Sequence, residues 1–373
     1  MTLCKDKRRG QGAARRRAAA VLGWLVAAAA ACGGDDDGGD DGADPSPDGG
    51  SAVDSGAAAD SGSAEDAGAA LPNATIVFVH ASPDFPTVRF CFDLNGQSTP
   101  LGPQPEQPLP GQPYPGLVPG TGGAVPDTGV DPSAFAITPY AVVAEAIQPA
   151  VSGGVAEAQH CNEIIPGQVD PGEYVELAEI PRGTLARGAS LIAALTGCLP
   201  AGADPEATPA ACGVDYDPAV GNLALRAAPV DRVGSASAGE TGFQAVHLSS
   251  QAETAQINGL YFAVVRADGD VVPIGGRAAF AGEGAGPVNL TEVVAAADAF
   301  AVFDGDPAAG GELVLAQPIA VAQANTVGPG QPDYVVPGKT YTIVLLGDPA
   351  VSPPPGEPAG TAGHFLVFPS DPS

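Results

Sequence analysis

The sequence predicts an all-β protein whose folded part consists of two tandem β-sandwich units. The 373 residues include 51 Gly and 39 Pro, which favour turns and loops over long helices. Apolar segments of strand length recur from residue 74 onward, separated by Gly and Pro turns. A short motif near residue 80 returns near residue 247, which indicates a tandem duplication.

The first 31 residues have the features of an export signal peptide. A basic segment, Lys5 to Arg17, precedes the apolar run Ala18 to Ala31, which is too short to span a bilayer comfortably. The stretch Ala30-Ala31-Cys32-Gly33 resembles a bacterial lipobox, whose Cys is lipidated and becomes the new N-terminus. We therefore predict a lipid anchor at Cys32; the alternative is an ordinary signal peptide with a free Cys. Arg15-Arg16-Arg17 leaves twin-arginine export open beside the general route.

Residues 32–71 are a predicted disordered tether of Gly, Asp, Ala and Ser. The stretch 33–70 holds ten Asp, one Glu and no basic residue, so charge repulsion and the lack of apolar surface keep it extended. Calcium binding is the functional alternative, but these carboxylates lack a rigid frame. A Cys followed directly by such a tether suits a lipid-anchored head in the bacterial cell envelope. Gly33 rather than Asp after the Cys indicates the outer membrane, by resemblance to enterobacterial lipoproteins.

The charge balance restricts the partners. There are 15 Lys+Arg against 43 Asp+Glu, and the formal net charge is −28. Without residues 1–31, the chain keeps 8 basic and 42 acidic residues and a formal charge of −34. Such a surface repels nucleic acid and favours cationic or neutral partners, such as an envelope protein or a glycan.

The first predicted sandwich, 72–230, begins with two strand-like segments, 75–80 and 88–93. Pro83 and Pro86 exclude a helix between them. Val79-His80-Ala81-Ser82-Pro83-Asp84-x-Pro86-x-Val88 closely resembles the signature VHASPDAPxVDV of the domain-of-unknown-function family 4397, departing from it at Phe85 and Arg89. The resemblance implies a secreted or envelope protein with immunoglobulin-like, antiparallel β-sandwiches. It supplies no biochemical role.

Further strand-like segments follow in both units. The first unit continues with 134–148 (helix is possible from Tyr140), 172–177, 190–196 and 222–226. The second, 240–373, is the degenerate copy. Its residues 243–249 align with 77–82, its segment 337–348 parallels 186–197 with Ile343 matched to Ile192, and 364–368 matches 222–226.

A proline-rich insertion, 100–132, interrupts the first unit. It contains ten prolines, a density that no β-ladder tolerates, so we expect a surface loop of polyproline II character. A spacer at the sandwich rim is the simpler interpretation. As a binding loop, it would present Leu109, Tyr114 and Leu117.

His80, Ser82 and Asp84 are the one polar group that suggests catalysis. A triad needs its histidine between nucleophile and carboxylate, converging in space, whereas three residues of one extended segment point in parallel. We therefore expect Ser82 and Asp84 to close a turn with His80 packed beside it. His247-x-Ser249 repeats the motif without the acid, which suits a structural role.

No cofactor or metal is predicted. The four histidines are far apart, and no Cys-x-x-Cys pair exists. Acidic pairs in predicted loops are of the kind that calcium uses, but none belongs to a twelve-residue loop ending in Glu. Solvated turn acids are the favoured interpretation of these pairs, which are Asp215 with Asp217, Asp268 with Asp270, and Asp304 with Asp306.

Four cysteines follow the tether, and an exported protein meets an oxidising compartment. We expect two disulfides among them, with three pairings possible. Cys198–Cys212 is favoured because it closes a short Pro- and Ala-rich loop directly after a strand, and this leaves Cys91–Cys161.

Together these features predict an exported, lipid-anchored envelope protein that acts in binding, adhesion or structure and is not an enzyme. The alternative is an envelope hydrolase with its site in the inter-strand loops. The chain offers few His, Lys and Arg for such a site.

Overall fold

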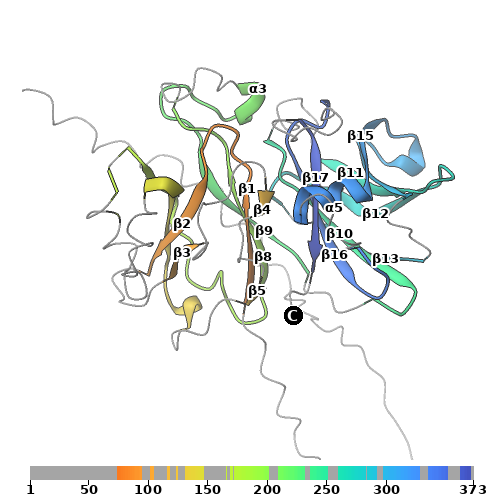
Figure 1. Cartoon of the computed structure of the whole chain (residues 1–373), viewed down its shortest axis with the longest axis horizontal. Helices are drawn as coiled ribbons and strands as arrows, with labels where there is room; N and C mark the ends of the chain where they lie inside the picture. Colours follow the sequence, from red (N-terminus) through yellow and green to blue (C-terminus); the bar gives the residue numbers. More distant parts are fainter. Residues whose placement is uncertain are drawn as a thin grey trace, which may run out of the picture. The chain divides into compact units, whose positions relative to one another are not determined.

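The computed structural model describes residues 74–94, 101–104, 116–117, 123–124, 131–146, 165, 169–170, 172–200, 209–231, 236–250, 259–282, 284–291, 297–327, 335–351 and 362–370. The predicted signal peptide, Cys32 and the tether lie outside these ranges. The described chain is nearly all β and folds into four sheets, which confirms the predicted class (Figure 1). By its internal contacts, 68–373 is one compact unit.

Strands before residue 230 form the first two sheets. One has the order β4-β1-β8-β9, with β5 also paired to β1, and the other has the order β3-β2-β6-β7. The first contains β1 (Thr75–His80), β4 (Gly116–Leu117), β5 (Gly123–Ala124), β8 (Ser190–Thr196) and β9 (Ala224–Pro229). The second contains β2 (Val88–Asp93), β3 (Leu101–Gln104), β6 (Thr138–Val143) and β7 (Tyr174–Glu176). Two short helices, η1 (Pro132–Ala134) and α3 (Pro209–Cys212), lie in the connections.

Phenylalanines of β1 and β2 hold these two sheets together. The ring centroids of Phe78 and Phe90 are 5.0 Å apart, and those of Phe78 and Phe92 are 5.1 Å apart. All three belong to one buried apolar cluster with Leu195 of β8. Alternation along β2 therefore directs Phe90 and Phe92 into the sandwich, as the strand period requires.

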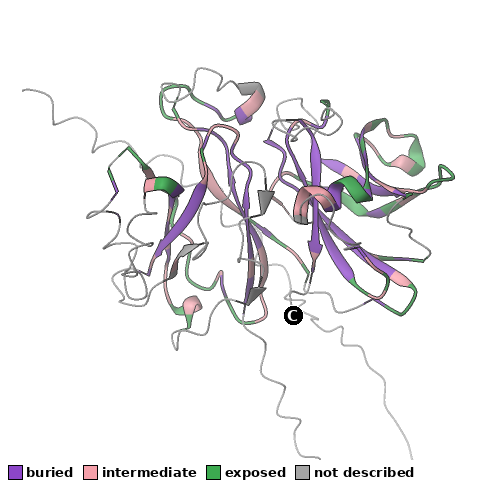
Figure 2. Cartoon of the chain, in the orientation of Figure 1, coloured by how far each residue is buried: buried purple, intermediate pink, exposed green. Residues whose placement is uncertain are grey.

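Strands from residue 240 onward form the other two sheets, with orders β13-β10-β16-β17 and β12-β11-β14-β15. The first contains β10 (Glu240–His247), β13 (Ala285–Thr291), β16 (Thr340–Leu346) and β17 (His364–Pro369). The second contains β11 (Leu260–Val265), β12 (Val271–Ala278), β14 (Ala299–Phe303) and β15 (Leu313–Pro318). Helices η4 (Pro307–Ala309) and α5 (Ile319–Val327) also belong to this part of the chain. Figure 2 shows β10, β16 and β17 as buried along nearly all of their length.

The two copies share one strand register. In each, the strand that ends with the motif histidine pairs in parallel with a later strand: His80 is opposite Leu195, and His247 is opposite Leu345. These two pairs depart from the antiparallel pairing expected from the sequence. A parallel pair requires a long crossover, and here the chain forms strands of the facing sheet before it returns.

The register corrects one detail of the internal alignment. Ile192 is opposite Val77, three residues before His80, whereas Ile343 is opposite Ala245, two residues before His247. The equivalent of Ile192 is therefore Thr342, opposite Gln244. A shift of one residue turns a side chain to the other face of a strand, which sequence similarity alone did not resolve.

The proline-rich insertion, 100–132, contains three short strands. The prediction that the whole insertion is a surface loop was therefore wrong. Its residues 101–104, which include Pro103, form β3 on β2. Leu117 lies in β4 opposite Val79, and Ala124 lies in β5 opposite Thr75. Pro is tolerated on edge strands, so a proline-rich segment can cover the edge of β1. Leu109 and Tyr114 lie outside the described residues.

The two sandwiches pack against each other through one apolar cluster, which we call the shared face. Its buried members are Val77, Val79, Ala81, Ile192, Ala194 and Ala228 of the first copy and Val246, Leu248, Val344, Leu346, Leu366 and Phe368 of the second. Val79 and Val246 each precede the motif histidine, and Ala81 and Leu248 each follow it. Equivalent faces of the duplicated sheet therefore meet.

Candidate functional site

The signature motif forms a tight corner at the end of β1. His80 Nε2 donates to the carbonyl oxygens of Pro86 (2.8 Å) and Phe85 (3.2 Å), and its Nδ1 accepts from the Ser82 amide (3.4 Å). Ser82 Oγ donates to Asp84 Oδ1 at 3.2 Å, and Asp84 Oδ2 accepts from the Leu199 amide at 2.9 Å. The corner thus connects β1 to the segment that follows β8.

With these hydrogen bonds, the side chains of His80, Ser82 and Asp84 are not arranged as a catalytic triad. Ser82 bonds to Asp84 rather than to the histidine, and both ring nitrogens of His80 already contact backbone groups. Burial lowers the pKa of His80 from 6.5 to about 4, so the ring is neutral near pH 7. A serine triad needs the nucleophile within reach of a free histidine nitrogen. The expected turn is therefore what the motif builds.

The second copy repeats the histidine but not the acid. His247 Nδ1 accepts from the Ser249 amide at 3.2 Å, and Ser249 Oγ donates to the Gly347 carbonyl. The His247 ring meets Phe280 edge-on at 5.7 Å, as His80 meets Phe85 at 6.3 Å. Burial lowers the pKa of His247 to about 4. Both copies therefore use the histidine as a neutral structural group.

A disulfide-bonded loop lies beside the first corner. Cys198 and Cys212 form the expected bond, with their Cα atoms 5.3 Å apart. Asn222 joins the same two residues: its Oδ1 accepts from the Cys198 amide at 2.8 Å, and its Nδ2 donates to the Cys212 carbonyl at 2.9 Å. Cys91 is also disulfide-bonded, but Cys161 lies outside the described residues, so the Cys91–Cys161 pairing stays a prediction.

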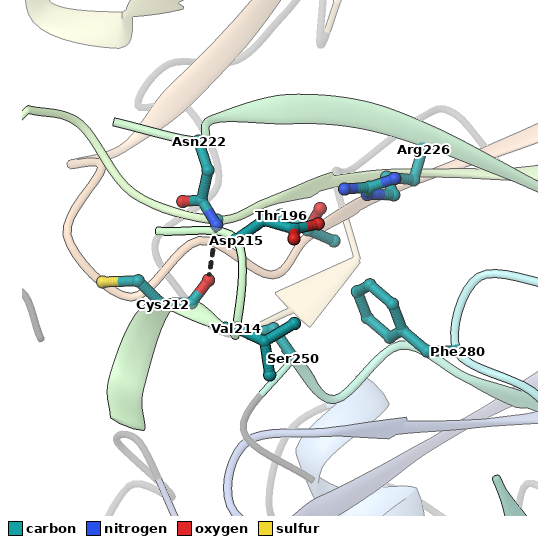
Figure 3. A pocket seen from close by; sticks show the side chains of 10 residues that line it. Thr196, Cys212, Val214, Asp215, Asn222, Arg226, Ser250 and Phe280 are labelled. Atoms are coloured by element: carbon teal, nitrogen blue, oxygen red, sulfur yellow. Dashed lines mark hydrogen bonds between the residues drawn. The ribbon is translucent and has the colours of Figure 1, made fainter. Parts of the chain in front are cut away.

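A small cleft lies between this loop and the second sandwich (Figure 3). Thr196, Asn222 and Arg226 line it from the first copy, and Ser250 and Phe280 line it from the second. The Arg226 guanidinium lies 5.7 Å from the centroid of the Phe280 ring, a cation–π contact. The cleft encloses about 10 Å³, room for about one water molecule. It is therefore a junction between the sandwiches, and recognition of a larger ligand would have to use the surface around it.

One aspartate of each acidic pair stabilises a turn by accepting a backbone hydrogen bond. Asp217, Asp268 and Asp306 each accept a hydrogen bond from the backbone amide two residues further on, at 2.8 to 3.2 Å. Within the described ranges, no group of three or more His, Cys, Asp or Glu side chains is arranged to hold a metal ion. The solvated turn acids expected from the sequence are what these pairs form.

Sequence reasoning located the corner and the disulfide but missed the groups that surround them. Asn222, Arg226 and Phe280 carry no motif, and no local pattern places them together. The internal repeat was the available signal for Asn222 and Arg226, since both belong to the segment 222–226 that it marks; Arg226 lies in β9 and Asn222 lies just before it. Cys32, Leu109 and Tyr114 are outside the described residues, and Leu117 belongs to β4.

Comparison with known proteins gives little. No protein-family model matches the chain, and no curated protein matches it. One similar solved structure is described as "a putative cell adhesion protein from Bacteroides uniformis"; the alignment is 10% identical, covers 80% of this chain and 98% of that chain, and has a TM-score of 0.21. At that TM-score the two backbones do not superpose as a whole. The resemblance of 79–88 to domain-of-unknown-function family 4397 stays a prediction.

Proposed function

We propose that this chain is an exported, lipid-anchored protein of the bacterial cell envelope whose folded part is a binding module. The observation that carries the proposal is the use of the signature motif: His80, Ser82 and Asp84 are all bonded within the corner and to its neighbouring backbone. The motif therefore builds a frame, and frames of this kind present recognition loops at the ends of their strands. No observation favours the hydrolase alternative.

The proposed location rests on three features. Cys32 follows a signal-like segment and precedes the acidic tether. The Cys198–Cys212 bond suits an oxidising compartment such as the periplasm or the cell surface. In the described part of the chain, no helix is both long and apolar enough to cross a bilayer. A lipid on Cys32 would supply the attachment, and outer-membrane sorting is part of the same proposal.

Lipidation is tested directly by mass. The mature protein should begin at Cys32 and carry a diacylglycerol-type lipid, and Cys32→Ala should move it from the membrane to the soluble fraction. Cys4→Ala is the matched control, because Cys4 lies in the segment that processing removes. A Cys32→Ala protein that stays in the membrane would contradict the proposal.

The binding role is tested by capture from envelope extracts with the purified full-length protein. We expect a protein or glycan ligand of positive or neutral charge, because the chain without residues 1–31 has a formal charge of −34. Turnover of ester, amide or glycoside substrates that disappears in a folded His80→Ala variant would instead support the hydrolase alternative.

A further inference from the structure

The loop between α3 and β9, residues 213–221, is exposed and is bonded at both of its ends. The Cys198–Cys212 disulfide lies at its start, and Asn222 at its end bonds to both cysteines. Inside it, Asp217 accepts bonds from the amides of Ala219, Val220 and Gly221. A loop tied at both ends and capped within loses little conformational entropy when a partner binds.

Two glycines show how tightly the loop ends are packed. A Cβ at Gly197 would lie 2.4 Å from the Asn222 carbonyl oxygen, and one at Gly221 would lie 2.6 Å from the Cys198 carbonyl oxygen. Both residues have positive φ, which only glycine adopts readily. Tyr216 packs into the buried cluster around the disulfide and anchors the middle of the loop. The loop therefore keeps its shape while its remaining side chains face solvent.

Those side chains combine apolar groups with carboxylates. Val214 is 50% exposed and Val220 is 70% exposed. Six large apolar side chains are exposed among the described residues, and two of these six lie within this nine-residue loop. Asp215 and Asp217 are exposed between them, and 213–221 contains no basic residue.

From this combination we propose that loop 213–221 is the recognition surface of the binding module and that its partner is a basic protein segment with apolar side chains. The valines would contact the apolar groups, and the aspartates would pair with Lys or Arg. The net negative charge of the whole chain would raise the association rate with such a partner. This inference rests on the proposed function and names its surface; it does not use the proline-rich insertion.

The test measures binding of three twelve-residue peptides to the full-length protein: one alternating Lys with Leu, one alternating Lys with Ser, and one alternating Glu with Leu. We expect the Lys/Leu peptide to bind most tightly. The double substitution Val214→Ser with Val220→Ser should weaken it about tenfold, and Asp215→Asn should weaken it less. The matched control is Val271→Ser with Val351→Ser, because these valines are also exposed, at 41% and 50%, on other segments. The control should bind as the wild type does.

Three outcomes would overturn the inference: no binding of the Lys/Leu peptide, equal binding of the Lys/Ser peptide, or an equal loss in the control. Binding that requires added calcium would also overturn it, because the aspartates would then be cation ligands. The proposed function is judged separately by capture from envelope extracts. Capture that the loop variant leaves unchanged would reject this surface but keep the binding role, whereas no capture would count against both.

Discussion

At the scale of single residues, the described histidines show that a conspicuous polar residue can be purely structural. His80, His247 and His364 are each at most 1% exposed, and each is neutral at pH 7 because burial lowers its pKa to about 4. His80 and His364 contact backbone carbonyl oxygens, and the rings of His80 and His247 each meet a phenylalanine ring. The sequence showed that two of them repeat, and only the structure showed that they are enclosed.

These histidines predict the pH dependence of stability. Their pKa is about 6.5 in the unfolded chain and about 4 in the folded one, so below pH 6.5 the unfolded state binds more protons. Stability should therefore fall as the pH falls from 7 to 5, by about 2 kcal/mol for each histidine. Urea unfolding midpoints at pH 7, 6 and 5 measure this.

A histidine substitution tests whether the pH dependence of stability comes from the buried histidines. His364→Gln removes one titrating ring, and the variant's midpoint should vary less between pH 7 and 5 than that of the wild type. A wild-type midpoint that is constant or rises as the pH falls would show that the rings are accessible to protons in the folded state.

At the scale of elements, the proline-rich insertion was predicted to be a loop, but it contributes strands to two sheets. Deleting 103–126 removes β4 and β5 and half of β3, and it exposes the edge of β1. We expect a lower Tm, a loss of about 1 kcal/mol for each ladder hydrogen bond removed, and aggregation through the bare edge. Thermal melts and light scattering measure these effects.

A matched control keeps the strands. Replacing 105–115 with a Gly/Ser segment of equal length leaves β3, β4 and β5 in place, and we expect a smaller change in Tm. A deletion variant that melts as the wild type does would mean that the insertion is only a spacer at the sandwich rim.

The cysteines give a second prediction at this scale. Peptide mapping without reductant should recover Cys198 joined to Cys212 and Cys91 joined to Cys161. Breaking the first bond by Cys198→Ser with Cys212→Ser should cost about 3 kcal/mol, because it frees a short loop in the unfolded chain. Free thiols detected by alkylation, or a different pairing, would contradict this prediction.

At the scale of the whole molecule, the shared face joins the two sandwiches through buried apolar side chains of both copies. Val79 and Val246 are equivalent positions of the two copies, and both are fully buried in that face. One equivalent pair of positions differs in polarity: Val77 in the first copy corresponds to Gln244 in the second. Gln244 bonds to the backbone of Asp231, which lies in the connection between the two copies. That connection needs polar partners, which an apolar side chain cannot supply.

We therefore expect a single unfolding transition for the folded part. Val246→Asp and Val79→Asp should each lower the free energy of unfolding by roughly 3–5 kcal/mol, because each buries an unpaired charge. Hydrogen exchange should show β1, β8, β10 and β16 losing protection together in either variant. Val351→Asp is the exposed control. Loss of protection confined to the substituted copy would mean that the sandwiches are independent.

The sequence by itself determined the all-β class, the positions of many strands, the duplication, the corner and the favoured disulfide. These depend on local signals: side-chain alternation, prolines at fixed places and a repeated motif. The tertiary structure decided the parallel pairing of β1 with β8, the place of Leu117 in a sheet, the strands β11–β15, and the meeting of Arg226 with Phe280. Strand partners and buried faces are set by contacts between residues far apart in the chain. Local propensity does not encode those contacts, because the same strand is stable beside any neighbour that covers its apolar face.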